Sequence, residues 1–116
     1  MIEFQSYLDI PHNFTGICKI TSSGTIYHYK DGKRHNENGP AVVCKDGAKI
    51  WYINGLRHRE DGPAEEYING SKGWYYKGEY CGAGSEYCGA GNKFTNETWK
   101  EKVEYLKREE ELQIFL

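Results

Sequence analysis

Short runs of apolar and aromatic residues alternate with glycine-containing turns through most of the chain. Each run is about as long as one β-strand, and pairs such as Asp-Gly and Asn-Gly supply the positive φ angles of tight hairpin turns. The runs are TIYHY, AVVC, KIWYI and AEEYI. The turn pairs are Asp31-Gly32, Asn54-Gly55 and Lys77-Gly78 in one position, and Asp46-Gly47 and Asn69-Gly70 in another. The pattern predicts a mainly β fold, an antiparallel meander of repeated β-hairpins in a single sheet.

The hairpins belong to a repeat of 23 residues. The segments 24–46 and 47–69 align without a gap and share nine identical positions. Upstream, His12 falls in register with His35, and downstream Gly70 begins another copy of the first half of the unit. The repeat is therefore expected over about residues 11–80, in one domain that spans residues 1–116. Because each unit packs only on its neighbours, the end units need covering.

The segments YKDGKRH and YINGLRH resemble the motif of the MORN repeat, in which an aromatic residue precedes Asn-Gly and then Arg-His. The chain departs from that motif after the Arg-His pair, where it has NENGPA and REDGPA in place of further glycines. The motif WYxNGxxHRxDGPA is similar to a variant of the repeat found in small proteins of bacteriophages and large DNA viruses. The resemblance implies a single-sheet fold that serves as a scaffold or a binding module, in some cases close to lipid.

The pattern changes after Tyr80, where EYCGAG occurs twice and predicts a glycine-rich loop over residues 81–93. A helix is predicted over residues 94–111, with Thr95 as its N-cap. Its apolar stripe consists of Trp99, Val103 and Leu106. We expect this stripe to cap the last hairpins, because a helix with one apolar face and a sheet with an open end complete one another. The apolar tail, residues 112–116, packs on the same domain or contacts a partner or a second copy.

Aromatic side chains occupy two adjacent positions of the repeat and therefore opposite faces of the sheet. One row contains Tyr29, Tyr52 and Tyr75, and the next contains His28, Trp51 and Trp74. One short helix cannot cover both faces, so one row is expected to be partly exposed. Tyr, Trp and Arg dominate the energetics of protein interfaces. The candidate partner-binding residues are Tyr29, Tyr52, Tyr75, Trp51, Trp74, Arg34, Arg57, His35 and His58.

The histidines His12, His35 and His58 recur at one repeat position and are expected to form a row with a spacing of roughly 9 to 10 Å. That spacing is too wide for one zinc ion, whose ligands converge on a single centre. We therefore expect each histidine to brace its turn through the backbone of the ENG or EDG segment that follows it. No metal site is predicted.

The Arg-His pairs also suggest an anion site, since a guanidinium group offers a planar fork to phosphate or carboxylate. Acidic residues within the same loops oppose this interpretation. Glu37, Glu60 and Asp61 are expected to neutralise the Arg34 and Arg57 side chains internally.

Several function classes are disfavoured by the rest of the sequence. The chain lacks the motifs of nucleophilic, P-loop and zinc-protease enzymes, so we expect neither an enzyme nor a cofactor. Fifteen basic and seventeen acidic residues give a net charge of −2, which disfavours nucleic acid as a partner. The N-terminus lacks the pattern of a signal peptide and no segment is long enough to span a membrane, so a cytoplasmic location is expected. Free thiols are then expected at Cys18, Cys44, Cys81 and Cys88.

The sequence thus favours a non-catalytic binding module. Because the repeat motif resembles that of phage proteins, we expect the chain to bind and inhibit or redirect a host protein, such as a bacterial defence effector, in the host cytoplasm. The alternatives are a sponge or sensor for a small anionic ligand, either a signalling nucleotide or a lipid headgroup, and a dimeric structural scaffold. Both a monomer and a homodimer are consistent with the sequence.

Overall fold

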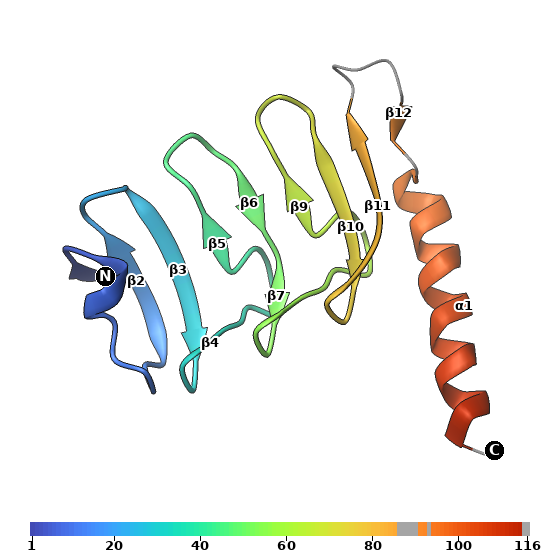
Figure 1. The fold of residues 1–116 in the computed structure, drawn as a ribbon, viewed down its shortest axis with the longest axis horizontal. Coiled ribbons are helices and arrows are strands. Elements are labelled where there is room, and N and C mark those ends of the chain that lie inside the picture. The colour runs from blue at the N-terminus through green and yellow to red at the C-terminus, as the bar shows by residue number, and fades with distance from the viewer. Residues whose placement is uncertain (86–90, 93, 115–116) are drawn as a thin grey trace.

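The computed structural model describes residues 1–85, 91–92 and 94–114. It confirms the predicted fold class, because a mostly antiparallel sheet with one C-terminal helix makes up the chain (Figure 1). The described elements are β1 (Ile2–Phe4), the 3-10 helix η1 (Tyr7–Asp9), β2 (Gly16–Ile20), β3 (Thr25–Lys30), β4 (Lys33–Arg34), β5 (Val42–Val43), β6 (Lys49–Ile50), β7 (Tyr52–Ile53), β8 (Leu56–Arg57), β9 (Glu65–Glu66), β10 (Lys72–Tyr76), β11 (Glu79–Ser85), β12 (Gly91–Asn92) and α1 (Asn96–Ile114).

The strands follow one another across the sheet nearly in chain order. The order is β1-β2-β3-β5-β6-β9-β10-β11-β12, with β4 paired to β3, while β7 and β8 form a separate two-stranded hairpin. All the described pairings are antiparallel except that of β1 with β2, where Ile2 lies opposite Cys18 in a parallel register. The N-terminal strand thus lies beyond the first hairpin, and η1 follows it (Figure 1).

Three hairpins turn through the two-residue pairs expected from the sequence. At Asn54-Gly55 the φ angles are 49° and 83°, and the same signs occur at the other two pairs. Two successive positive φ angles define the type I′ turn, whose twist matches that of the flanking strands. Position 32 also requires glycine for steric reasons, because a Cβ there would overlap the carbonyl oxygen of His12.

The second set of turns differs from the first in conformation. Only the glycine of each pair has a positive φ, 101° at Gly47 and 87° at Gly70. The preceding Asp46 and Asn69 instead accept hydrogen bonds at their side-chain oxygens from the backbone N–H groups two residues later, each at 2.9 Å. Asp and Asn suit this position because a short side chain reaches its own backbone.

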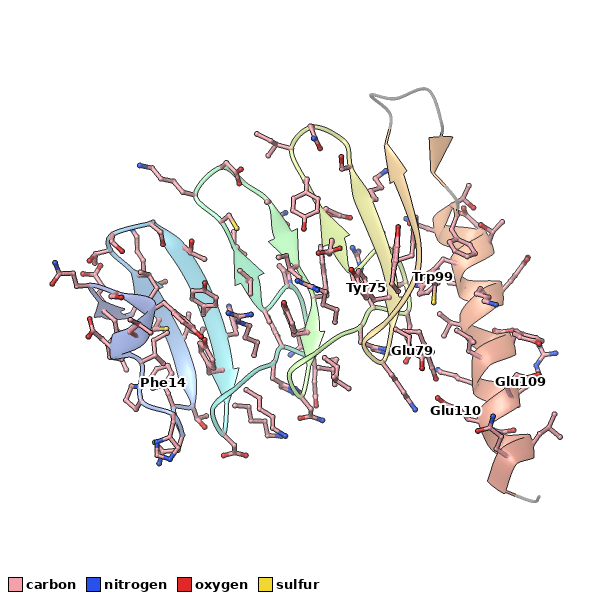
Figure 2. The ribbon with its side chains drawn as sticks, viewed as in Figure 1. Phe14, Tyr75, Glu79, Trp99, Glu109 and Glu110 are labelled. Atoms are coloured by element: carbon pink, nitrogen blue, oxygen red, sulfur yellow. The ribbon has the colours of Figure 1, made fainter. Side chains whose placement is uncertain are left out.

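Helix α1 caps the last strands of the sheet, as the sequence predicted. Trp99 and Val103 are buried against Trp74 and Tyr76, and Leu106 packs on the same cluster. The Trp99 and Trp74 ring centroids lie 5.5 Å apart. The indole N–H of Trp99 donates to the backbone oxygen of Arg59 at 2.7 Å, and Figure 2 shows Trp99 on the side of α1 that faces the sheet. The cap therefore has both an apolar and a hydrogen-bonded component.

The helix begins and ends slightly later than predicted. The Thr95 hydroxyl accepts from the N–H of Thr98 at 3.1 Å, which is the geometry expected of the predicted N-cap. At the other end, α1 extends to Ile114 and takes in most of the predicted apolar tail, with Leu112 exposed. Residues 115–116 lie outside the described part of the chain.

The predicted glycine-rich loop is wrong over its first residues. Strand β11 continues to Ser85 and pairs with β10, placing Lys72 opposite Gly84, and β12 pairs with β11 in turn. The backbone N–H and C=O groups of β10 need hydrogen-bond partners. The small residues of β11 can provide these partners because the hydrogen bonds involve only their backbone. Residues 86–90 and 93, which include Cys88, lie outside the described residues.

No helix in the described part of the chain combines the length and the apolar character that crossing a bilayer requires.

Candidate functional site

The two aromatic rows have different environments. Trp74 is 1% exposed because it lies under α1, so in this structure it packs in the core and not at a surface. Tyr29 and Tyr75 are half-buried on the other side of the sheet, and Tyr52 is buried at its centre. We name this side the tyrosine face, and Tyr75 is labelled on it in Figure 2. Each row therefore stays partly accessible, the first at Tyr29 and Tyr75 and the second at His28 and Trp51, and only the Trp74 end of the second row is covered by α1.

Tyrosine and arginine side chains alternate along the tyrosine face. The Arg34 guanidinium carbon lies 5.2 Å from the Tyr27 ring centroid and 5.5 Å from that of Tyr52. The Arg57 guanidinium carbon lies 5.7 Å from Tyr52 and 5.4 Å from Tyr75. We call these five residues the ladder. Each guanidinium sits within the range of cation–π attraction to two rings, which holds it in place between neighbouring repeats.

Tyr27, the first member of the ladder, is not among the candidate residues that the repeat pattern indicated. Its ring centroid lies 5.8 Å from that of Tyr29, because residues two positions apart in β3 share a face. That spacing was visible in the sequence. It was missed because position 27 is not an aromatic in the next repeat, where Ile50 stands.

A buried carboxylate completes the ladder at Arg57. Glu65 is 9% exposed, and its Oε2 lies 3.4 Å from Arg57 Nε, an ion pair rather than a short hydrogen bond. The Tyr67 hydroxyl donates to the same oxygen at 2.8 Å. Burial, together with the bond to Glu65, raises the pKa of Tyr67 to about 12. Sequence reasoning missed Glu65, because the acids it assigned to arginine were those of the nearer loops.

The repeat-equivalent Arg34 has no such partner. Val42 stands in its repeat at the position of Glu65, and no carboxylate in the described residues lies within ion-pair distance of Arg34. A hollow of about 300 Å³ lies beside it. Its lining residues are Tyr7, Tyr29, Gly32, Lys33, Arg34, Tyr52 and Gly55.

His35 and His58 brace turns, but not in the way predicted. His35 Nδ1 accepts from the backbone N–H of Asn54, and His58 Nδ1 accepts from that of Lys77, each at 2.9 Å. Each histidine thus holds the turn of the following repeat instead of its own ENG or EDG segment. The prediction failed because it considered only backbone close in sequence, whereas the neighbouring hairpin is nearer in space.

The predicted row of three histidines is also wrong. At the first turn the backbone N–H of Asp31 donates to the Thr15 hydroxyl at 2.8 Å, so Thr15 takes the place that His35 and His58 have later. The separation in sequence is 16 residues there and 19 at the other two turns. The upstream unit is therefore shorter, and alignment by residue identity placed His12 in a position that the fold gives to Thr15.

The acidic loop residues pair differently from the prediction. Glu37 and Glu60 lie 3.4 and 3.0 Å from the Nε2 atoms of His35 and His58. Asp61 binds Arg59 at 2.9 Å. The prediction that these acids neutralise Arg34 and Arg57 is therefore wrong. The loops that carry the acids lie toward the opposite face of the sheet from the ladder.

A hollow of about 630 Å³ lies on that opposite face beside Trp51. The Arg59 guanidinium carbon stands 3.9 Å from a Trp51 ring centroid and is already paired with Asp61 and Glu66. His58, the other basic residue in the lining, is paired with Glu60. Among the described residues, this hollow therefore has no unpaired basic side chain that could bind an anionic ligand. Trp51, a predicted partner contact, is half-buried beneath Arg59.

The cysteines and other metal-binding side chains do not form a site in the described part of the chain. Cys18 and Cys44 are free thiols there, and burial raises the pKa of each, while the Cys81 thiol donates to the backbone oxygen of Glu79 at 3.5 Å. No three His, Cys, Asp or Glu side chains among the described residues converge as a metal ion requires.

The chain matches no model of a known protein family, no curated protein and no solved structure. The candidate site therefore rests on the geometry of the ladder and the surfaces beside it.

Proposed function

We propose that the chain is a non-catalytic module that binds a protein partner through the tyrosine face. The observation that carries the proposal is the ladder, in which two arginines are held between tyrosine rings on the face that α1 leaves uncovered. Tyr and Arg are the residue types enriched at interface hot spots, and side chains already fixed in place lose little entropy on binding.

Exposed tyrosines extend the surface around the ladder. Tyr7, Tyr67 and Tyr80 are 53%, 41% and 54% exposed. Tyr7 lines the same hollow as Tyr29, Tyr67 binds Glu65, and the Tyr80 ring centroid lies 5.4 Å from that of Tyr75. These side chains form an accessible rim around a more buried centre, the arrangement typical of a protein-binding patch.

The resemblance to MORN-like repeats of bacteriophages suggests where the partner is found. On this basis we propose that the chain acts in the cytoplasm of a bacterial host and inhibits or redirects a host protein such as a defence effector. The surface chemistry of the tyrosine face does not depend on that assignment.

The test is affinity capture from a bacterial lysate at near-physiological salt, followed by titration calorimetry of the captured protein against variants. Tyr80→Ala and Tyr67→Ala are expected to weaken binding by about tenfold or more, the loss typical of a hot-spot residue. Tyr105→Ala is the matched control, because Tyr105 is 53% exposed but lies on α1. Failure to retain any protein, or equal losses in all three variants, would contradict the proposed surface.

A further inference from the structure

Two repeats of the chain each hold an arginine between two tyrosine rings, but only one of these arginines has a carboxylate beside it. Arg57 lies between Tyr52 and Tyr75 and is paired with the carboxylate of Glu65. Arg34 lies between Tyr27 and Tyr52, and the equivalent of Glu65 is Val42. The fold thus contains one arginine with an internal carboxylate and a second arginine without one.

We propose that Arg34, together with Lys33, forms a binding site for the carboxylate group of a small ligand from outside the chain. The hollow of about 300 Å³ beside Arg34 provides the space, at the lower end of the range for small-molecule pockets. A guanidinium group presents its N–H donors in a planar fork that matches a carboxylate. Glu65 on Arg57 is the chain's own example of that ligand chemistry.

The charges around the hollow favour an anion. Lys33 and Arg34 both line it, whereas no acidic side chain does. The nearest acid in sequence, Asp31, lies in the adjoining exposed turn and is absent from the lining. Although burial alone would lower the pKa of Arg34, the neighbouring Tyr29 and Tyr52 hydroxyls raise it, so the guanidinium stays charged.

The remaining lining is aromatic and suits a ligand with a ring or an apolar body. Tyr7, Tyr29 and Tyr52 surround the cations, and their hydroxyl groups can donate further hydrogen bonds to a carboxylate. A second hollow of about 260 Å³ shares Tyr7, Tyr29 and Gly32 and is lined also by Leu8, Ile10 and Pro11. The body of the ligand is therefore expected to extend toward η1.

This site does not depend on the proposed protein partner, and its test is separate from the capture experiment. We would titrate the isotope-labelled chain with acetate, benzoate and phosphate while following the arginine Nε–H and backbone NMR signals. Sodium chloride would hold the ionic strength constant, because added salt alone screens surface charge. The expected result is a saturable shift at Arg34 Nε–H, Gly32 and Gly55, stronger for benzoate than for acetate, with Arg57 Nε–H unchanged.

Two exposed lysines provide a matched pair of variants. Lys33→Gln removes a cation from the hollow and is expected to weaken benzoate binding several-fold. Lys49→Gln makes the same change in charge on β6, outside the lining of the hollow, and is expected to leave binding unchanged. Equal effects of the two variants would reduce the site to general attraction by net charge and overturn the proposal.

A third variant tests the comparison with Arg57 directly. Glu65→Ala removes both the carboxylate and the side chain that fills its place beside Arg57, so acetate can reach Arg57 and the Arg57 Nε–H is expected to begin responding. If Arg57 stays silent in the folded variant, an occupied carboxylate position is not what distinguishes the two arginines. Likewise, saturable binding of phosphate without binding of acetate or benzoate would refute a carboxylate site.

Discussion

Two replacements of His58 should separate two contributions to stability, the hydrogen bond that braces the last hairpin and the packing of the imidazole ring. The His58 side chain is 12% exposed, its Nδ1 accepts from the N–H of Lys77, and its ring centroid lies 5.1 Å from that of Tyr76. His58→Ala removes all of these contacts. His58→Asn is the informative comparison, since an Asn Oδ1 stands near the place of Nδ1 and can accept the same hydrogen bond.

The magnitudes follow from those contacts. A typical hydrogen bond contributes about 0.5 to 1.5 kcal/mol, and Lys77 is exposed enough for water to replace the lost acceptor in part. Loss of the packing between the His58 ring and Tyr76 adds about 1 kcal/mol, within the range for a pair of packed rings. His58→Ala should therefore lower the free energy of unfolding by about 2 kcal/mol, and His58→Asn by about 1 kcal/mol. A difference of about 1 kcal/mol corresponds to a few degrees in melting temperature for a domain of this size.

The assay combines thermal unfolding with amide hydrogen exchange of Lys77. In His58→Ala the Lys77 amide should exchange faster than in the wild type, whereas His58→Asn should keep most of its protection. His35→Ala and His35→Asn should show the same contrast at Asn54, whose N–H binds His35 Nδ1. The reasoning fails if the Asn and Ala variants are equally unstable and their Lys77 amides exchange equally fast.

Further predictions concern the turns, the cap and acid stability. Gly32→Ala should destabilise the chain more than Gly55→Ala, as measured by urea unfolding, because both positions have φ near 80° but only at Gly32 would the new Cβ overlap the His12 carbonyl oxygen. Trp99→Phe should cost about 1 to 3 kcal/mol of unfolding free energy, since it leaves the Arg59 carbonyl without its 2.7 Å donor; an unchanged melting curve would show that water satisfies this oxygen. Burial raises the pKa of Glu60, but bonds to Lys107 and His58 outweigh it and hold this pKa below its ordinary value of 4.5, so the resulting stability is present above pH 4.5 and is lost as pH falls through the folded-state pKa. Glu60→Gln should therefore reduce the slope of stability against pH on the acid side of 4.5, and identical slopes would contradict this linkage.

The features that sequence predicted correctly depend on short stretches of chain. The pair Asn54-Gly55 marks the place of its turn because both residues tolerate positive φ, although the same pair at Asn69-Gly70 makes a different turn in which only the glycine has positive φ. The spacing of Trp99 and Val103 places both on one side of a helix, and a sheet with an open end provides the surface that they cover. The positions of the turns, the antiparallel order of the repeats and the cap could therefore be predicted before any contact was known, whereas the conformation of the second set of turns and the parallel pairing of β1 could not.

The features that sequence missed depend on which repeat lies beside which. His58 meets Lys77 because the two belong to adjacent hairpins, and nothing in the RHREDG segment indicates a contact 19 residues away. Thr15 takes the role that His35 and His58 have later because the upstream unit is shorter. A sequence alignment without gaps cannot reveal a difference in repeat length. Strand β11 forms because β10 has backbone groups to satisfy, although the CGAGS sequence itself has weak strand character.

A repeating fold places the same side chain in nearly the same environment several times, so the positions where repeats differ carry the most information about function. Arg34 and Arg57 each lie between two tyrosine rings, and the change from Val42 to Glu65 gives only Arg57 a carboxylate partner while leaving the backbone pairing alike. Arg34 has tyrosine rings and hydroxyls as neighbours but no carboxylate within ion-pair distance among the described residues. A cation without a counter-charge is costly wherever it is partly withdrawn from water, and a purely structural repeat has no need of one at one rung alone. The difference between these two rungs is therefore better explained by something that binds Arg34 than by the requirements of the sheet.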